Sequence, residues 1–280
     1  MSARILDGRT LAAAVRASVK ETVARLAVRG VRPGLAVILA GDDPASRAYV
    51  RNKSRACEET GVHSVQFEYE SSVRQDELLD RVAALNEDPA VHGILVQLPL
   101  PKQIDSGKIL EAVSPAKDVD GFHPANLGAL VSGRPRVVPC TPAAVMRLLE
   151  QAGVPLAGRS AVVIGRSSIV GKPLALLLLQ KNATVTICHS KSQNIERVTK
   201  EADILIAAAG RAKLVGAAMV KPGACVVDVG ISRLADGSLA GDVDFDAVKE
   251  IAGWITPVPG GVGPMTIAML LENCVKAASL

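Results

Sequence analysis

A tyrosine and a lysine stand four residues apart in the first half of the chain, as Tyr49 and Lys53. Residues with this spacing share one face of a helix. A lysine held in a partly dry cleft can lose its proton near neutral pH and take part in proton transfer. The spacing therefore makes Lys53 a candidate for proton transfer on a helix face that it shares with Tyr49. An exposed lysine on a helix surface is the competing interpretation, and for a lysine taken alone it is the commoner one.

Two more polar side chains stand where a ligand would need them. Gln97 ends an apolar run and is followed by Leu98, in the sequence VQLPLP. The carboxyl ends of strands are where α/β sheets place their ligands. Asp120 lies in the turn-rich loop KDVDGFHP, residues 117–124, which has two acids and the position of a binding loop. A plain solvated turn is an equally good interpretation of this loop taken alone.

The stretch SAVVIGRSSIVGKPLALLLLQ, residues 160–180, predicts a strand, a sharp turn and a helix. Its first residues are apolar and β-branched, as in a buried parallel strand, and Pro173 suits the first turn of a helix. Backbone N–H groups at such a helix start bind anions, and Gly165 and Gly171 let a pyrophosphate approach closely. The pattern predicts the phosphate-binding turn of a nucleotide cofactor.

Two other interpretations of this turn compete with a cofactor site. A Walker A loop has four residues between its first glycine and Gly-Lys, which Ser or Thr then follows. Here five residues separate Gly165 from Gly171, and Pro173 follows Lys172, so ATP or GTP hydrolysis is disfavoured. A tight turn without a ligand stays open, because Ser167 occupies the place of the second glycine of Gly-x-Gly-x-x-Gly.

The next predicted strand, residues 183–188, distinguishes between the nicotinamide cofactors. In an NAD-binding unit the end of this strand carries Asp or Glu for the ribose hydroxyl. Here the strand is followed by HSKS, which has no acid. The hydroxyl of Ser190 and the guanidinium of Arg166 suit the extra phosphate of NADP instead. A solvated polar turn is the alternative for these residues taken alone.

Helices and strands alternate along the chain, which predicts an α/β fold with a largely parallel sheet. Asp7 and Gly30 bound the first expected helix, and Ser72 with Gln75 forms a capping box ahead of a later one. Thr141, with proline next to it, is predicted to cap a helix in the second half. The other expected elements are helices over residues 44–60 and 77–86 and strands over residues 35–40, 62–69, 91–97, 203–208 and 224–229.

Glycines follow the last two of these strands, as Gly210 and Gly230, at the ends where backbone can approach a ligand. The chain then closes with TPVPGGVGPMT, residues 256–266, and a helix to the C-terminus. This Pro/Gly loop is too specific for a linker. We expect the last helix to return and pack on the first domain.

Composition limits the class of protein. The 280 residues favour two domains, and 49% hydrophobic residues are ample for buried cores. Only 2% of residues are aromatic and the net charge of +4 has no dense basic block behind it, which argues against nucleic-acid binding. No apolar run has the length of a membrane span, and Arg16 and Lys20 interrupt the stretch where a signal peptide would lie. The five cysteines form no Cys-x-x-Cys pair and the four histidines have no metal-site spacing, so we expect reduced thiols in a cytoplasmic protein without a metal.

Six segments taken together resemble those of one family. They are GDDPAS-x-x-YV-x-NK, VQLPLP, KDVDGFHP, GRSSIVGKP, HSKS and TPVPGGVGPMT. Over nearly its whole length the chain is similar to the bifunctional methylenetetrahydrofolate dehydrogenase/methenyltetrahydrofolate cyclohydrolases of the bacterial soluble type. Arg47, where glutamine is frequent, and Ser192, where threonine is usual, depart from the family pattern at peripheral positions.

The resemblance implies two α/β domains with a cleft between them. Residues 1–140, joined by the C-terminal helix 265–280, would form the folate-binding catalytic domain, and residues 141–264 a Rossmann-like NADP-binding domain. The implied activity is oxidation of 5,10-methylenetetrahydrofolate by NADP⁺ to 5,10-methenyltetrahydrofolate, followed by hydrolysis to 10-formyltetrahydrofolate. The resemblance also implies a homodimer.

The same resemblance assigns roles to single residues. Lys53 would manage the proton during hydration, Gln97 would hold Lys53 or the attacking water, and Tyr49 would orient the folate. Asp120 would accept hydrogen bonds from the pterin ring. The folate site would further include Leu98, Pro259, Gly260 and Gly261, and the cofactor site would include Gly165, Arg166, Ser167, Ser190 and Ile231.

Two other functions compete with this one. Short-chain dehydrogenases also use Tyr-x-x-x-Lys, but in them the pair follows the Gly-rich turn, whereas here Tyr49 precedes Gly165 by over a hundred residues. The second competitor is a protein that binds NADP without catalysis. Retention of Lys53, Gln97 and Asp120 together would be unexpected in such a protein.

Overall fold

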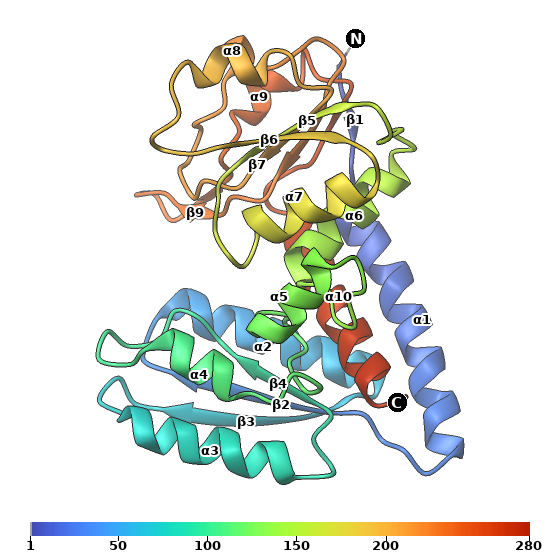
Figure 1. Ribbon diagram of the computed structural model, residues 1–280, viewed down its shortest axis with the longest axis vertical. Coiled ribbons are helices and arrows are strands. Elements are labelled where there is room, and N and C mark those ends of the chain that lie inside the picture. Colours follow the sequence, from blue (N-terminus) through green and yellow to red (C-terminus); the bar gives the residue numbers. More distant parts are fainter. Residues whose placement is uncertain (1) are drawn as a thin grey trace. The chain divides into compact units, whose positions relative to one another are not determined.

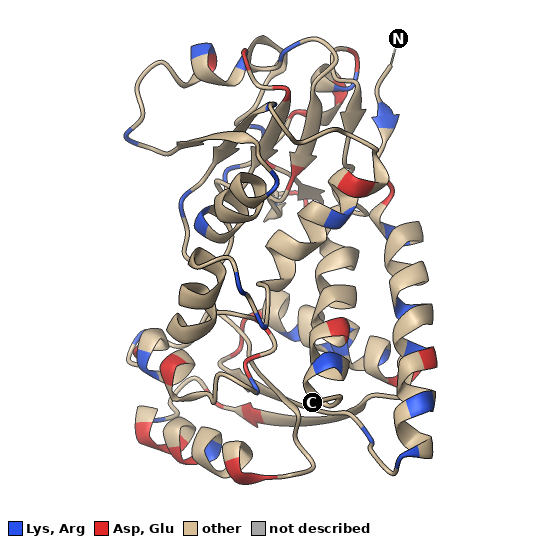
Figure 2. Ribbon diagram, turned by 45° about the vertical axis from the view of Figure 1, so that its right-hand side comes forward, with Lys and Arg blue, Asp and Glu red and all other residues tan. Residues whose placement is uncertain are grey.

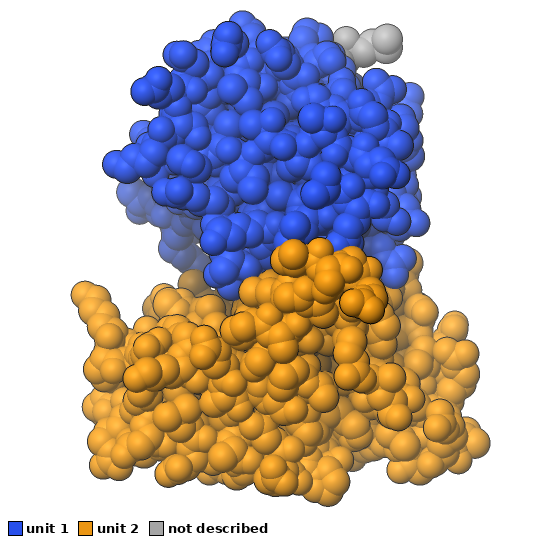
Figure 3. Space-filling view, viewed as in Figure 1, with its two compact units in different colours: residues 1–12, 141–266 blue, residues 13–140, 267–280 orange. Residues whose placement is uncertain are grey.

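The computed structural model describes residues 2–280, which divide into two compact units, drawn in different colours in Figure 3. Each unit is an α/β structure with its own parallel sheet, which confirms the predicted fold class (Figure 1). Unit 1 comprises the residues up to Ala12 and Thr141–Thr266, and unit 2 comprises Ala13–Cys140 and Ile267–Leu280.

Unit 2 is organised on a three-stranded parallel sheet in the order β3-β2-β4. The central strand β2 is apolar and buried along its whole length, as expected of a parallel strand covered on both faces. Edge strand β3 has no fully buried residue. The strands are β2 (Gly34–Ala40), β3 (His63–Tyr69) and β4 (Gly93–Val96), and the helices are α2 (Pro44–Thr60), α3 (Gln75–Glu87), α4 (Ser106–Ala112) and α5 (Pro124–Val131).

Helix α2 carries the Tyr–Lys pair and has the bounds that the sequence predicts. The Asp43 carboxylate accepts a hydrogen bond from the backbone N–H of Ser46 at 2.8 Å, and Pro44 lies in the first turn. Gly61 ends the helix in the left-handed conformation, with φ 83°, and its N–H donates to the carbonyl of Cys57. These local signals are confirmed because each one lies within a turn of the residues that it organises.

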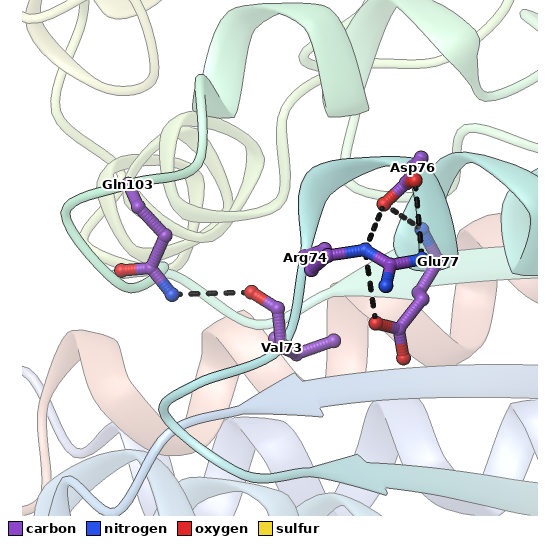
Figure 4. Close-up of polar contacts among 5 residues, drawn as sticks. All are labelled: Val73, Arg74, Asp76, Glu77 and Gln103. Atoms are coloured by element: carbon purple, nitrogen blue, oxygen red, sulfur yellow. Dashed lines mark hydrogen bonds and ion pairs between the residues drawn. The ribbon is translucent and has the colours of Figure 1, made fainter.

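The capping box predicted at Gln75 is wrong. Helix α3 begins at Gln75 with Arg74 as its N-cap, and the Arg74 side chain does not cap it. Figure 4 shows Arg74 paired instead with Asp76 and Glu77, at N–O distances of 3.0 and 3.5 Å. The side-chain oxygen of Gln75 accepts from the backbone N–H of Asp105 at 2.8 Å. A partner thirty residues away in the sequence thus takes the glutamine that the local pattern assigned to the cap.

Helix α6 (Cys140–Gln151) begins at Cys140, two residues before Pro142, the predicted first helical residue. Thr141, expected as the N-cap, lies inside the helix, and its hydroxyl pairs with that of Thr266 at 3.2 Å. Thr266 belongs to α10 (Val262–Ala277), so Thr141 joins two helices rather than closing its own.

Unit 1 is built on a six-stranded parallel sheet in the order β1-β11-β8-β7-β5-β6. The strand order reverses at β5, which lies between β6 and β7, and such a switch point is where open α/β sheets bind nucleotides. The strands are β1 (Arg4–Ile5), β5 (Ser160–Ile164), β6 (Thr184–Cys188), β7 (Ile204–Ala207), β8 (Cys225–Asp228) and β11 (Trp254–Ile255), with a separate hairpin of β9 (Ser232–Arg233) and β10 (Leu239–Ala240). The other helical segments are α7 (Gly171–Gln180), α8 (Ile195–Thr199), η1 (Ala217–Met219) and α9 (Phe245–Val248).

The first residues of the chain belong to the sheet of unit 1. Strand β1 pairs in parallel with β11, and the guanidinium of Arg4 lies 5.2 Å from the ring centroid of Trp254. The division of the structure therefore differs from the predicted one, which placed all of residues 1–140 together. It falls within helix α1 (Gly8–Val28), whose first residues belong to unit 1 and whose remainder belongs to unit 2.

The end of the chain packs in unit 2. Asn273 of α10 donates to the carbonyl oxygen of Val119 at 2.9 Å, and the Cys274 thiol lies 3.6 Å from the carbonyl oxygen of Gly34. The last helix thereby supports the sheet and the loop of a unit whose other residues lie far earlier in the sequence.

Two features of the whole chain bear on its class. Within residues 2–280, no helix combines the length and the apolarity needed to cross a bilayer. Lysine and arginine are scattered over both units rather than gathered in one block (Figure 2).

Candidate active site

The lysine predicted from the Tyr-x-x-x-Lys spacing is buried. Lys53 of α2 is 9% exposed, and its Nζ donates a hydrogen bond to Oε1 of Gln97 at 2.9 Å. Gln97 directly follows β4, and its Nε2 donates to the carbonyl oxygen of Leu98 at 2.8 Å. Burying an ammonium is costly unless it is hydrogen-bonded, so the amide both holds and compensates the amine. Lys53 is therefore not a helix-surface lysine.

Tyr49 lies one turn before Lys53 on the same helix and is half-buried. Burial raises the pKa of its phenol. The phenol therefore stays protonated at neutral pH, and the residue presents an uncharged ring and hydroxyl on the face that carries the amine.

The two acids of the KDVDGFHP loop have different surroundings. Asp118 is 5% exposed, and its carboxylate accepts from the backbone N–H groups of residues 121–123 at 2.8 to 3.2 Å. Asn126 of α5 donates to the same carboxylate at 2.8 Å. These four bonds engage the acceptor capacity of Asp118 inside the loop. Asp118 thus fixes the shape of the loop and leaves Asp120 available to a ligand.

Asp120 is within electrostatic range of the amine. Burial raises the pKa of its carboxyl, the Lys53 ammonium is near enough to oppose this rise, and the negative charge of Asp118 adds to it. The Cys140 thiol forms a hydrogen bond with the carboxyl group. The structure therefore brings Lys53, Gln97 and Asp120, predicted from three separate segments, into one cluster within unit 2.

In unit 1, the predicted phosphate-binding turn joins β5 to α7. Gly165 has φ 131°, and a Cβ on it would lie 2.2 Å from the carbonyl oxygen of Ala208. A Cβ on Gly171 would lie 2.2 Å from the carbonyl oxygen of Gly165. Both glycines are therefore required for the turn to pack on itself and on the residue after β7, which is the close-packing role of glycine in dinucleotide-binding turns.

The start of α7 does not offer the free donors that the sequence predicts. The Ser167 hydroxyl accepts from the N–H groups of Val170 and Gly171 at 3.2 and 3.3 Å, and its carbonyl accepts from Lys172 at 3.0 Å. Ser167, in the place of the motif's second glycine, therefore engages two N–H groups at the start of the helix, whose N-cap residue is Val170. In the part of the chain that the structure describes, the unpaired N–H groups of this turn are those of residues 166–169. The donors available to a phosphate thus lie in the loop before the helix.

Arg166 and Ser190 lie just beyond two paired strand ends. The last residues of β5 and β6 pair with each other, and each of the two predicted residues stands two positions further on. Both residues are exposed. In the turn after β6 it is Ser192 whose hydroxyl accepts from the His189 N–H, at 2.9 Å, and among the described residues the Ser190 hydroxyl has no partner. An exposed guanidinium and an unpaired hydroxyl thus share one edge of the sheet.

The remaining predicted residues also belong to unit 1. Gly260 and Gly261 are buried against the start of α1, where a Cβ on Gly8 would lie 1.8 Å from the Gly261 carbonyl oxygen, whereas Pro259 is exposed. Ile231 is 40% exposed and lies shortly after the end of β8. The residues predicted to bind folate are therefore divided between the two units.

Two family models match the chain. Residues 6–120 match the catalytic domain of tetrahydrofolate dehydrogenase/cyclohydrolase, and residues 139–280 match its NAD(P)-binding domain. A protein from Nitrosospira multiformis, named Bifunctional protein FolD, is 59% identical over 278 residues, which cover 99% of this chain and 96% of the relative. The chain belongs to the tetrahydrofolate dehydrogenase/cyclohydrolase family.

Solved structures of FolD proteins agree with this assignment. The FolD methylenetetrahydrofolate dehydrogenase/cyclohydrolase of Campylobacter jejuni is 50% identical with a TM-score of 0.97, and 99% of each chain is covered. The FolD of Trypanosoma brucei, solved with NADP cofactor and an inhibitor, is 42% identical with a TM-score of 0.97, and 100% of this chain and 98% of that one are covered. Membership of the family confirms the resemblance seen in the six sequence segments.

Residues around Asp120 in this family member were not predicted from the sequence. They are Asp118, whose carboxylate accepts backbone hydrogen bonds of the loop, and Cys140 and Asn273, which both donate to the carbonyl oxygen of Val119. Asp118 had a usable signal, because an Asp three residues before Gly121 is typical of a side-chain-closed turn. The other two had none, because their partners lie far away in the sequence.

The buried acids of unit 1 were also not predicted. Asp242 accepts from three successive backbone N–H groups, those of residues 209–211, at 2.6 to 2.8 Å. Asp228, at the end of β8, accepts from the N–H groups of Gly230, Asp242 and Val243 at 2.8 to 2.9 Å. The two carboxylates thereby fix the backbone beyond β7 and β8, the edge at which such sheets bind their ligands.

Proposed function

We propose that this chain oxidises 5,10-methylenetetrahydrofolate with NADP⁺ and hydrolyses the resulting 5,10-methenyltetrahydrofolate to 10-formyltetrahydrofolate. Relatives that match over its full length are named Bifunctional protein FolD. The observation that carries the proposal is the buried Lys53, held by Gln97 and close to Asp120. Such a cluster suits a reaction that moves a proton and serves no purpose in binding NADP alone, so it disfavours a non-catalytic NADP-binding protein.

We assign the folate chemistry to unit 2 and the cofactor to unit 1. The match of residues 6–120 to a catalytic-domain model and of residues 139–280 to an NAD(P)-binding model supports this division. Lys53, Gln97, Leu98 and Asp120 then act from unit 2.

The residues of unit 1 fit a cofactor that carries an extra phosphate. The exposed guanidinium of Arg166 and the hydroxyl of Ser190 supply hydrogen bonds to that phosphate, and the N–H groups of residues 166–169 supply donors to the pyrophosphate. Within residues 2–280 neither this hydroxyl nor these N–H groups have a partner. When bound, NADP⁺ supplies the hydride acceptor. Hydride transfer gives no proton to the enzyme, so in this step the chain acts by holding its reactants in position.

The hydrolytic reaction needs a group that moves a proton. Water adds to the cationic methenyl carbon and loses a proton, which gives a neutral hydroxyl adduct. As the bond from that carbon to a ring nitrogen breaks, the hydroxyl loses its proton to become the formyl carbonyl and the nitrogen gains one, so that one proton is released overall. We assign these transfers to the amine of Lys53. The uncharged acceptor of Gln97 holds the nitrogen at 2.9 Å and so fixes the position of the amine.

Asp120 and Tyr49 position the folate. In its ionised form Asp120 accepts hydrogen bonds from N–H groups of the pterin, and the nearby Lys53 ammonium favours that form. The protonated phenol of Tyr49 provides a flat surface on the face of α2 that carries Lys53.

We further propose that the protein works as a cytoplasmic homodimer. The family resemblance supports the dimer, and five buried, unpaired cysteines support a reducing compartment. Light scattering coupled to size exclusion measures the assembly, and a monomer mass at micromolar concentration would contradict the dimer.

One assay tests the proposed function. Purified protein is mixed with methylenetetrahydrofolate and NADP⁺, and absorbance follows NADPH and the methenyl intermediate. We expect NADPH to form and the intermediate to disappear faster than it does in buffer. A second run starts from methenyltetrahydrofolate without NADP⁺ and isolates the hydrolytic step. Binding of NADP⁺ without turnover in either run would contradict the proposal.

A further inference from the structure

An asparagine near the C-terminus lies behind the loop that carries Asp120. Asn273 of α10 is 8% exposed, and its Nδ2 donates to the carbonyl oxygens of Val119 at 2.9 Å and of Val138 at 3.0 Å. Val119 immediately precedes Asp120, and Val138 lies just before α6. One side-chain amide therefore ties together two segments of unit 2 that meet at the candidate site.

The Cys140 thiol joins the same group. Its Sγ donates to the carbonyl of Val119 at 3.3 Å and lies 3.6 Å from Nδ2 of Asn273. The same S–H is also within reach of the Asp120 carboxyl group, so the two acceptors share it, and burial keeps the pKa of the thiol well above its ordinary value. Asn273 therefore acts on Asp120 in two ways. It contacts the Cys140 thiol, which is a neutral neighbour of the Asp120 carboxyl group, and it donates to the carbonyl oxygen of Val119, the residue just before Asp120.

The residue after Asp120 is equally constrained. Gly121 has φ 76°, and a Cβ on it would lie 2.7 Å from the backbone nitrogen of Pro139. The loop therefore packs closely against residues 138–140 at Gly121, and the Val119 carbonyl oxygen accepts a hydrogen bond from Cys140 of the same segment. Asp120 lies between these two points of attachment.

We propose that Asn273 is a positioning residue that sets the place of the Asp120 carboxylate, and thereby the affinity for the folate substrate, without touching the substrate. The inference rests on the role proposed for Asp120. The chemistry of the amide suits this task, because its N–H donors satisfy two carbonyl oxygens while adding no charge. A lysine or arginine at this position would compete for the carboxylate that the folate requires.

Two variants of Asn273 test the inference. Asn273→Leu keeps a similar volume and removes the donors, and Asn273→Asp keeps the shape but turns acceptors toward the two carbonyls. We expect the KM for methylenetetrahydrofolate to rise about tenfold or more, the scale of a lost buried hydrogen bond, with a smaller change in kcat. The Kd for NADP⁺, measured by calorimetry, is expected to stay unchanged.

Cys274→Ala is the matched control. Cys274 is the next residue on α10 and fully buried, and its thiol contacts the carbonyl of Gly34 rather than the Asp120 loop. Its removal loosens the same helix, so we expect a lower unfolding midpoint with an unchanged folate KM. If Asn273→Leu also lowered the midpoint and left the folate KM unchanged, its role would be structural only and the inference would be overturned.

A measurement on the wild-type protein covers the case in which neither Asn273 variant folds. In hydrogen exchange, a folate inhibitor is expected to protect residues 118–123 and residues 137–141 together, because Asn273 ties the two segments. Protection confined to residues 118–123 would overturn the inference. A wild-type protein with neither activity would instead overturn the proposed function, and an unchanged folate KM in Asp120→Ala would overturn the role of Asp120.

Discussion

In unit 2 the groups proposed to do chemistry are side chains that hold one another, whereas in unit 1 buried carboxylates hold backbone. Lys53 is bonded to Gln97 and lies close to Asp120, so the reactive atoms are themselves the connected ones. Asp228 and Asp242 instead accept six hydrogen bonds from backbone N–H groups beyond β7 and β8. Acid–base chemistry needs a titratable side chain positioned at the reacting atoms. Binding a cofactor that accepts hydride needs a backbone surface whose shape is fixed.

This difference has a consequence for mutations. A change in the side-chain cluster is expected to reduce folate affinity or the rate of a chemical step and to leave cofactor binding intact. A change at the edge of the unit 1 sheet is expected to alter cofactor affinity or stability and to leave hydrolysis of the methenyl compound intact.

The largest expected effect is that of Lys53→Met, which keeps the stem of the side chain and removes the amine. Hydrolysis of methenyltetrahydrofolate should fall by about 10²–10⁴-fold, the usual contribution of a positioned acid or base. Dehydrogenase activity should fall less, because hydride transfer passes no proton to the enzyme. Disappearance of the methenyl compound above the uncatalysed rate is the measurement. Arg51→Met, an exposed change on the same helix, is the control. Near wild-type hydrolysis by folded Lys53→Met would rule out the proton role.

Asp120→Ala should abolish or strongly weaken both activities, because both use the folate that Asp120 is proposed to hold. A lost charge-assisted hydrogen bond corresponds to about 1.5–3 kcal/mol in folate affinity, or roughly 10- to 150-fold. NADP⁺ binding should be unchanged. Calorimetry with each ligand provides the test, and unchanged folate affinity in the variant would refute the assignment.

The buried acid of unit 1 predicts a pH dependence of stability. Burial raises the pKa of Asp228 to about 6, against about 3.9 for an unfolded chain. Between these values the native state binds more protons than the unfolded state, so this group lowers the free energy of unfolding as pH rises from 4 to 6, by up to about 3 kcal/mol.

Asp228→Asn should remove that slope, as seen in denaturant unfolding at several pH values. Asp203, at the other end of the sheet, gives the opposite sign for comparison. The hydrogen bond from Lys221 lowers the pKa of Asp203, so its contribution is lost as pH falls. An unchanged slope in Asp228→Asn would show that the acid is not the source.

Arg166→Ala should weaken NADP⁺ binding by about 1–3 kcal/mol, the range for a hydrogen bond to a charged group. NAD⁺ binding should change far less, because NAD⁺ lacks the extra phosphate. Arg159→Ala, an exposed change next to the amino end of β5, is the matched control. Equal losses for both cofactors would contradict the assignment of Arg166 to the phosphate.

The smallest effect is expected at Arg47, where this chain departs from the glutamine frequent in the family. Arg47 pairs with Asp42 at 2.9 Å and with Glu68 at 3.3 Å, and its side chain is 40% exposed. Exposed ion pairs contribute about 0–1 kcal/mol, so Arg47→Gln should change the free energy of unfolding by less than about 1 kcal/mol. Both activities should stay at the wild-type level. A large loss of either would place Arg47 in the site.

The sequence by itself determined what nearby residues can encode. Asp43, Pro44 and Gly61 set the bounds of α2, and apolar β-branched runs set the buried strands, because capping bonds and side-chain periodicity act over a few residues. The motif segments determined the family. Residue types and neighbours made Lys53, Gln97 and Asp120 candidates, and the family resemblance assigned their roles.

Tertiary structure alone decided which partner each polar group takes. The pattern at Gln75 suggested a local cap, yet its side chain accepts a hydrogen bond from the backbone of Asp105. Free N–H donors were expected at the start of α7, yet the Ser167 hydroxyl accepts from Gly171 there. Asn273 meets Val119 across 154 residues of sequence, and no local rule encodes such a pairing. The physical reason is that a hydrogen-bonding group accepts any partner of suitable geometry, and only the packed chain determines which partner lies within reach.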